Sequence, residues 1–227
     1  TISFDKGDAR SIKMKDASGE EVNVQINETL KYPDGSLRKV SAVFIARGVP
    51  SIGYKTYYVV PEQKDMEVIS ASGKMAETPF YKVRFDEGGI RSIFDKELNK
   101  ELLKTGKIGG GDVFTLKSVG NGAGEFADIQ ETEMEGFDIV SKHCPEWEIT
   151  ENGTVYVTFK IRQPIRNAVV ENSVKIYKGI KKIDFDVALL NWEGVLYREF
   201  RFILPLNMAG GQVAYEVPYG VLEVGKD

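Results

Sequence analysis

The stretch TVYVTFKI, residues 154–161, decides the fold class because its side chains alternate with a period of two. One face carries the apolar residues Val155, Val157, Phe159 and Ile161, and the other face carries Tyr156, Thr158 and Lys160. Half-buried antiparallel strands give this alternation, since one face packs and the other meets water. The pattern recurs in IDFDVAL (183–189), REFRFIL (198–204) and QVAYEV (212–217). The sequence therefore predicts an all-β protein built as a sandwich of antiparallel sheets.

A hairpin is predicted at residues 80–94. FYKVRF and IRSIF flank Asp86-Glu87-Gly88-Gly89, whose glycines supply the positive φ that a tight turn requires. The next stretch, FDKELNKELLK (94–104), leaves two readings open. Its apolar residues are spaced four apart, as on a short helix. It also fits a strand end, a polar turn and the next strand, and we favour this turn.

The chain divides into two strand-rich blocks. A polar segment with prolines at both ends, PEQKDMEVISASGKMAETP (61–79), separates them. We expect part of a small β domain at 1–62, a linker at 63–76 and a large β domain at 77–227. The opening residues lack the basic start and apolar stretch of a signal peptide. We expect the chain to begin and end inside a longer protein.

Composition argues against several classes of function. The 30 basic residues are scattered among 34 acidic ones, with no basic stripe for a phosphate backbone, so we expect no nucleic-acid partner. No apolar run approaches the roughly 20 residues that span a bilayer, so we expect no membrane partner. The composition fits a cytoplasmic protein as well as a periplasmic or secreted one.

Cys144 and His143 are the only cysteine and the only histidine. No disulfide can form within the chain, and a structural zinc site needs about four N or S ligands. Any nucleophile–histidine arrangement would depend on His143 alone, and we interpret it as a loop histidine. We therefore predict no catalytic residue and no metal ligand in this chain.

Two glycine-rich loops lie at residues 106–112 and 120–126. A dinucleotide fingerprint requires a strand before it, a helix after it and a parallel sheet, so we interpret these loops as turns between strands. Glu125 and Asp128 stand on or beside the second loop, and loops carry binding residues more often than strand faces do.

Five stretches together resemble a known family. They are PSIGYKTYYVV (50–60), FYKVRFDEGGIRSIFDKELNKELL (80–103), VENSVKIYKGIKKIDFDVALLNWEG (170–194), YREFRFILPL (197–206) and VAYEVPYGVLEV (213–224). In this order they resemble the C-terminal β region of α-mannosidases of glycoside hydrolase family 38. None of the five is a catalytic motif, and their order and spacing carry the resemblance.

The resemblance implies the end of a small β-sandwich domain followed by a large antiparallel supersandwich of the galactose mutarotase type. Family members hold a zinc ion and a nucleophilic aspartate in an N-terminal α/β barrel, which a helical bundle follows. Neither has a counterpart in this chain, so its expected partners are that catalytic barrel, the helical bundle and mannose-containing glycans. We expect no cofactor in the chain itself. A mutarotase is disfavoured, because its chemistry needs more than one histidine.

The resemblance also selects candidate substrate-binding residues. NGAGEFADIQ (121–130) is similar to the family segment that leans toward the active-site cleft. Animal members carry a tyrosine where this chain has Gly124, so other residues of the loop must serve. The candidates are Asn121, Gly122, Glu125, Phe126 and Asp128, with Gln130 beside them. Alternatively, the loop only packs on the barrel, or the chain is a stand-alone carbohydrate-binding or scaffold module that uses Trp147 or Trp192.

Overall fold

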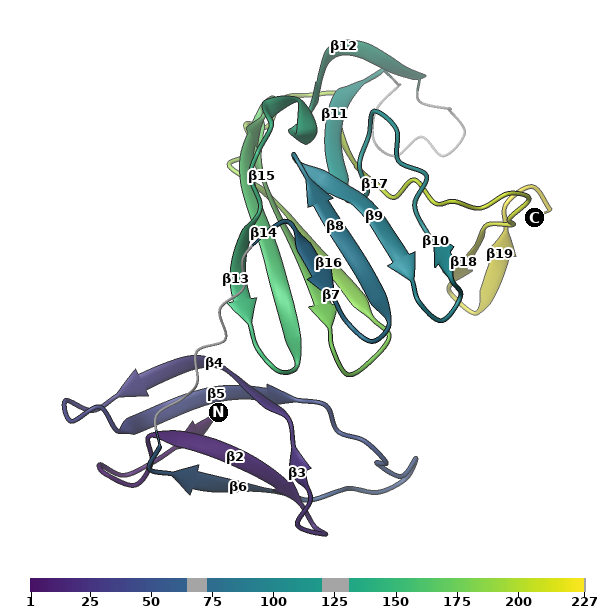
Figure 1. Ribbon diagram of the computed structural model, residues 1–227. Coiled ribbons are helices and arrows are strands. Elements are labelled where there is room, and N and C mark those ends of the chain that lie inside the picture. The colour runs from purple at the N-terminus through teal and green to yellow at the C-terminus, as the bar shows by residue number, and fades with distance from the viewer. Residues whose placement is uncertain (65–72, 120–130, 227) are drawn as a thin grey trace.

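The computed structural model describes residues 1–64, 73–119 and 131–226, and these residues form β-strands with one short 3-10 helix (Figure 1). Every strand pairing is antiparallel, as between β14 (Tyr156–Ile165) and β15 (Ala168–Tyr177). No α-helix occurs in the described part of the chain, and no helix there could cross a membrane. The predicted all-β sandwich is confirmed.

Strands β1 to β6, which we name the N-terminal unit, form two three-stranded sheets. The first has the order β1 (Ile2–Ser3), β5 (Leu37–Phe44), β4 (Val24–Lys31), and the second β3 (Glu21–Val22), β2 (Ser11–Asp16), β6 (Tyr57–Glu62). Ile12 of β2 packs with Leu37 and Val40 of β5 in one buried cluster. The two sheets therefore form a small sandwich, with β4 and β5 stacked over β2 and β6 (Figure 1).

Strands β7 to β17, which we name the large sandwich, form three sheets. One sheet contains β10 (Lys100–Glu101), β9 (Gly89–Asp95), β8 (Tyr81–Asp86) and β7 (Met75–Glu77). The second contains β13 (Glu148–Asn152), β14, β15 and β16 (Ile183–Leu190). The third contains β12 (Glu131–Ile139), β11 (Asp112–Val119) and β17 (Arg198–Ile203), and the helix η1 (Val140–His143) follows β12. A separate hairpin, β18 (Ala214–Val217) and β19 (Gly220–Glu223), ends the chain.

The sheet β13–β16 carries the core on one face. Phe159 of β14 is fully buried and stacks on Phe85 of β8 at 4.0 Å between ring centroids. Further along the same face of β14, Ile161 packs with Val113 of β11. Alternate residues of a strand share a face, so both other sheets pack on this one side. A bridge between Ile90 and Gly110 links those two sheets into a single layer.

Local turns agree with the sequence predictions. Strands β8 and β9 form the predicted hairpin around Glu87-Gly88, with Gly88 at φ +73°. Residues 96–99 form a turn before β10, so the favoured turn is confirmed and the helical alternative is wrong. The glycines of the 106–112 loop allow close packing, because a Cβ on Gly89 would lie 3.0 Å from Gly109 Cα.

Two expectations about solvent-facing residues are wrong. Tyr156 and Thr158 of β14 are buried like the core face, at 2% and 5% exposure. Glu151 of β13 accepts hydrogen bonds from both hydroxyls, and the N-terminal unit also contacts Tyr156. Conversely, Val187 and Leu189 of β16 are about two-fifths exposed although they share the face of Phe185. Position along a strand therefore decides burial together with alternation.

Candidate functional site

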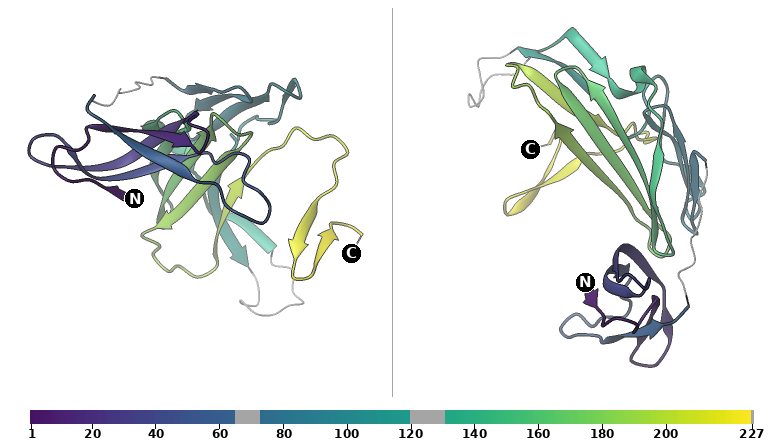
Figure 2. Two further views of the ribbon diagram at one scale, coloured as in Figure 1. Left: turned by 90° about the horizontal axis from the view of Figure 1, so that it is seen from below. Right: turned by 90° about the vertical axis from the view of Figure 1, so that its left-hand side faces the viewer.

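The N-terminal unit contacts one end of the large sandwich, beneath the turns β13–β14 and β15–β16 (Figures 1 and 2). Gln25 of β4 is buried, and its Oε1 accepts hydrogen bonds from the backbone N–H groups of Val155 and Tyr156 at 3.1 and 2.9 Å. Asn27 Nδ2 donates to the Tyr156 hydroxyl at 2.7 Å. Burial and the neighbouring Glu151 raise the pKa of Tyr156 to about 12, so its hydroxyl stays neutral at pH 7.

A second bridge joins the units further along the same end. Arg47, in the segment between β5 and β6, donates from Nη2 to the carbonyl oxygen of Gly179 in the β15–β16 turn. Thr154 of the β13–β14 turn donates to the carbonyl oxygen of Val24 at 2.9 Å. Between these bridges lies a cavity of about 330 Å³, which we name the inter-unit cleft. Its polar lining comes from both units, with Asp16, Glu20, Glu21, Asn23, Arg47, Lys55 and Tyr57 on one side and Thr154 and Lys178 on the other.

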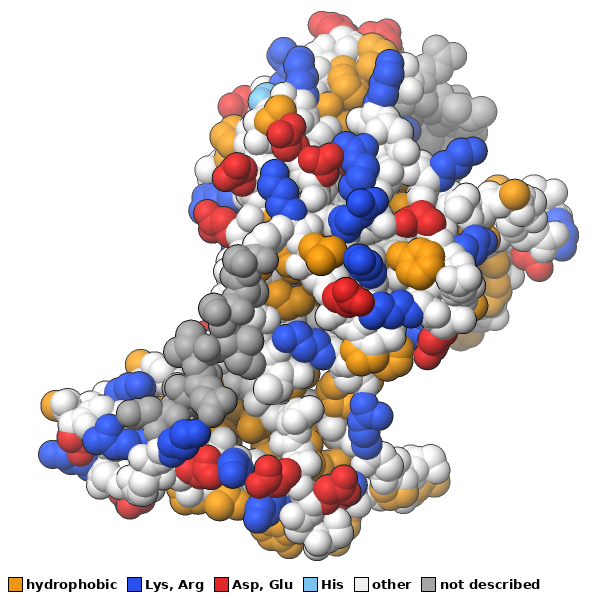
Figure 3. Space-filling view, viewed as in Figure 1, with side chains coloured by type: hydrophobic (Ala, Val, Ile, Leu, Met, Phe, Trp, Pro, Cys, Tyr) orange, Lys and Arg blue, Asp and Glu red, His pale blue; other side chains and the backbone are white. Residues whose placement is uncertain are grey.

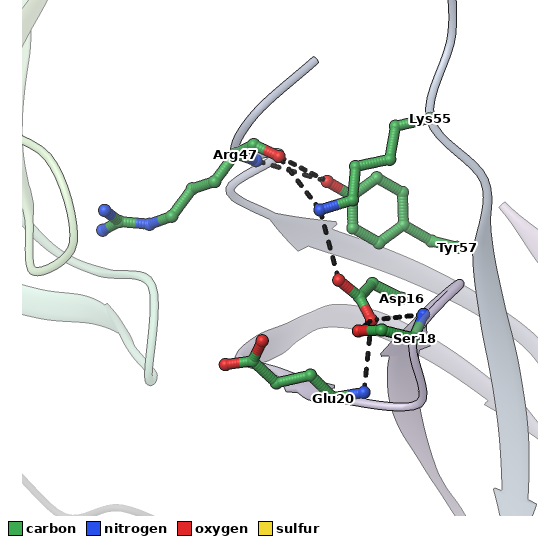
Figure 4. Close-up of polar contacts among 6 residues, drawn as sticks. All are labelled: Asp16, Ser18, Glu20, Arg47, Lys55 and Tyr57. Atoms are coloured by element: carbon green, nitrogen blue, oxygen red, sulfur yellow. Dashed lines mark hydrogen bonds and ion pairs between the residues drawn. The ribbon is translucent and has the colours of Figure 1, made fainter.

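Asp16 and Lys55 form the polar centre of the N-terminal wall (Figure 4). Asp16 Oδ1 accepts bonds from the hydroxyl and backbone N–H of Ser18 and from the backbone N–H of Glu20. Lys55 Nζ lies 3.2 Å from Asp16 Oδ2. The Ser18 hydroxyl, helped by Lys55, lowers the pKa of Asp16 to about 2, and the bond to Asp16 raises the pKa of Lys55. This pair is therefore charged across the physiological range.

The same lysine fixes the segment that carries Arg47. Lys55 Nζ donates to the Arg47 carbonyl oxygen at 3.2 Å, and the Tyr57 hydroxyl accepts from the Arg47 backbone N–H at 3.2 Å. On the opposite wall, Lys178 Nζ donates to the Gly153 carbonyl oxygen at 2.6 Å and to Asn152 Oδ1 at 3.2 Å. Burial lowers the pKa of Lys178. These contacts fix the positions of the polar side chains on both walls of the cleft.

The sequence of the large sandwich decides the family. Residues 76–227 match the model of the glycosyl hydrolases family 38 C-terminal domain. The chain belongs to glycosyl hydrolase family 38. The match covers most of the chain and contains four of the five stretches named above. No curated protein matches the chain.

The predicted binding residues of this family 38 chain cannot be placed beside the cleft. Asn121, Gly122, Glu125, Phe126 and Asp128, with Gln130, lie outside the described residues. Their role therefore stays a prediction.

His143 is a loop-anchoring residue in this family 38 chain. It ends the helix η1, and its Nε2 lies 2.8 Å from Asp138 Oδ1. The other oxygen of Asp138 accepts the backbone N–H of Arg166 at 2.9 Å. Within residues 1–64, 73–119 and 131–226, no group of three or more His, Cys, Asp and Glu side chains is placed to hold a metal ion.

The two tryptophans have different surroundings. Trp147 packs on Phe85 at 4.9 Å between centroids and donates from Nε1 to the Asp86 carbonyl oxygen at 3.0 Å, so it belongs to the core. Trp192 is 41% exposed and meets Phe200 edge to face at 5.2 Å. Of these two candidates for a carbohydrate-binding module, Trp192 is therefore the more accessible.

Sequence reasoning did not find the inter-unit cleft. One wall comes from residues 16–57 and the other from residues 154–179, and most of these residues look like ordinary polar turn positions. One local signal was readable: the run Asp16-Ala17-Ser18-Gly19-Glu20 has the composition of an Asx turn, in which a side-chain oxygen accepts nearby backbone N–H groups.

Proposed function

We propose that the chain is the non-catalytic C-terminal β region of an α-mannosidase that hydrolyses terminal α-mannosides. It supports and borders the active site of a catalytic barrel that this chain does not contain. The observation that carries the proposal is the family match over residues 76–227. The zinc ion and the nucleophile would belong to the barrel, and the barrel, the helical bundle and mannose-containing glycans are the proposed partners.

The surface of the chain favours a role inside a larger enzyme. Exposed large apolar side chains are frequent from β16 to the end of β19, among them Val187, Phe202, Val213, Tyr215 and Val221, at 38–67% exposure. Soluble monomers rarely expose a large contiguous apolar patch, and such surfaces usually mark an interface. We propose that other parts of the enzyme cover this surface.

Charge gives no competing indication of a polyanionic partner. On the face that Figure 3 shows, basic and acidic side chains are interspersed over the large sandwich. A nucleic-acid surface would instead need basic side chains gathered in a patch or stripe.

The experiment compares the longer protein that contains this chain with a variant from which residues 76–227 are deleted. We expect the longer protein to hydrolyse an aryl α-mannoside faster than the aryl β-mannoside or α-glucoside. The deletion should abolish this turnover. Zinc content and circular dichroism of the deletion variant show whether its barrel still folds.

Two outcomes contradict the proposal. A deletion variant that keeps full activity would remove the supporting role, and a preference for another glycoside would remove the α-mannosidase assignment. If the longer protein has no glycosidase activity and the isolated chain binds glycans, the alternative of a carbohydrate-binding module holds instead.

A further inference from the structure

We propose that the inter-unit cleft binds a small neutral saccharide or a related polyol. The cleft has a volume of about 330 Å³, which lies at the lower end of the roughly 300–1,000 Å³ typical of small-molecule sites. Both of its walls belong to this chain. The inference therefore concerns binding alone and does not rest on the enzymatic activity proposed above.

The charged side chains that line the cleft balance in sign, with Asp16, Glu20 and Glu21 acidic and Arg47, Lys55 and Lys178 basic. Asp16 forms an ion pair with Lys55 inside the cleft. Glu21 Oε1 lies 3.5 Å from Nζ of Lys13, which does not line the cleft. Lys178 directs its ammonium group to backbone and amide oxygens of its own wall. A ligand with a net charge would leave one sign in excess within the cleft, whereas a neutral polar ligand keeps this balance. The charge pattern therefore favours a neutral ligand.

Three side chains retain hydrogen-bonding capacity. Within the part of the chain that the structure describes, the Glu20 carboxylate and the Asn23 amide have no partner, and Arg47 uses only Nη2 of its guanidinium group. Figure 4 shows the Glu20 carboxylate and the Arg47 guanidinium group extending toward the large sandwich. The cleft thus offers an acceptor, a donor and an amide that does both.

Hydroxyl groups match this set, because each one donates one hydrogen bond and accepts others. A ligand with several hydroxyls can donate to Glu20 and accept from Arg47 and Asn23 at the same time. Val22 and Ile45 also line the cleft and supply apolar contact for the C–H groups of such a ligand. A sugar ring or a short polyol combines both kinds of surface.

The test titrates the complete 227-residue chain, labelled with ¹⁵N, with methyl α-D-mannopyranoside and with α-mannobiose. Inorganic phosphate and glutamate serve as charged probes. We expect shifts of the backbone amide signals of Asn23, Arg47 and Gly179 with the sugars, and none with the charged probes. Glu20→Ala should weaken sugar binding at least tenfold, because it removes a charged hydrogen-bond acceptor.

Glu146→Ala is the matched control. Glu146 is exposed like Glu20, and its carboxylate likewise has no partner among the described residues, but it lies outside the cleft. Its substitution should leave sugar binding unchanged. The proposal fails if neither sugar shifts these signals, if the shifts map elsewhere, if phosphate or glutamate binds more tightly, or if the two variants bind alike.

Discussion

Truncating Gln25 should break the main contact between the N-terminal unit and the large sandwich. Its Oε1 accepts two backbone hydrogen bonds, at 3.1 and 2.9 Å, from residues that are each only 2% exposed. Gln25→Ala leaves the N–H groups of Val155 and Tyr156 without this acceptor. Gly153 lies against the same side chain, since a Cβ there would be 2.2 Å from Gln25 Cδ.

The expected loss of stability follows from the two backbone N–H groups of Val155 and Tyr156 that lose their acceptor. A buried donor left unsatisfied costs roughly 1–3 kcal/mol. Water that enters the vacated space recovers part of this, so we expect Gln25→Ala to lower the free energy of unfolding by about 2–4 kcal/mol. Gly153→Ala should also destabilise, because the new methyl group displaces Gln25. In the Gln25→Ala background the methyl group has room, so the two losses should not add.

Urea unfolding followed by circular dichroism measures these changes. Gln63→Ala is the control: Gln63 also bonds two backbone groups, the carbonyl oxygens of Gly7 and Asp8, but it is exposed. Gln63→Ala should change the free energy of unfolding by no more than about 0.5 kcal/mol, as is usual for surface positions. Equal losses for Gln25→Ala and Gln63→Ala, or additive losses for Gln25→Ala and Gly153→Ala, would refute this reasoning.

Three further predictions concern the core, the cleft and the undescribed loop. Phe159→Ala should lower the free energy of unfolding, measured by urea titration, by about 3–5 kcal/mol, because the ring is fully buried against Phe85. A decrease below about 1 kcal/mol would contradict this description of the core. The Asp16 carboxyl should titrate at about pH 2 when followed by NMR. Ser18→Ala should raise this midpoint, because the Ser18 hydroxyl stabilises the ionised carboxylate. An unchanged midpoint would mean that other contacts lower the pKa of Asp16. In the proposed longer enzyme, Glu125→Ala or Asp128→Ala should lower kcat/KM by about one to two orders of magnitude. Unchanged kinetics would make the loop a spacer.

The pH dependence of Asp16 has a definite sign. Its folded-state pKa of about 2 lies below its ordinary value of 3.8. The stabilisation that its charge provides is therefore complete above the ordinary value and is lost as pH falls through the folded-state value. The pairing with Lys55 in the cleft wall should accordingly persist at neutral and mildly acidic pH.

The fold could be predicted because its signals are local. Alternation in β14 and the glycines between β8 and β9 each fix a short-range geometry. The turn after Asp95 was more ambiguous, since its apolar spacing also fits a helix. In the structure, the backbone N–H groups of Glu97 and Leu98 donate hydrogen bonds to the Asp95 side chain and so fix a turn. The spacing of apolar residues does not reveal these bonds.

The burial errors and the cleft share a physical cause. Tyr156 is buried because Asn27, more than 100 residues earlier in the chain, lies against it. The cleft likewise exists only where the segment of Arg47 meets the turn of Gly179. Such contacts depend on how two units pack, and single-strand patterns carry no information about that packing. The exposure of Val187 likewise depends on which other segments pack against β16, and its own strand pattern does not contain that information.

Turnover by the isolated chain is the most direct test of its non-catalytic role. The 227-residue chain is incubated with an aryl α-mannoside, with and without added zinc, beside the proposed longer protein that carries the catalytic barrel. We predict hydrolysis by the longer protein and none by the isolated chain under either condition. Activity that purifies with the isolated chain, and that disappears when a residue within it is substituted, would contradict this role.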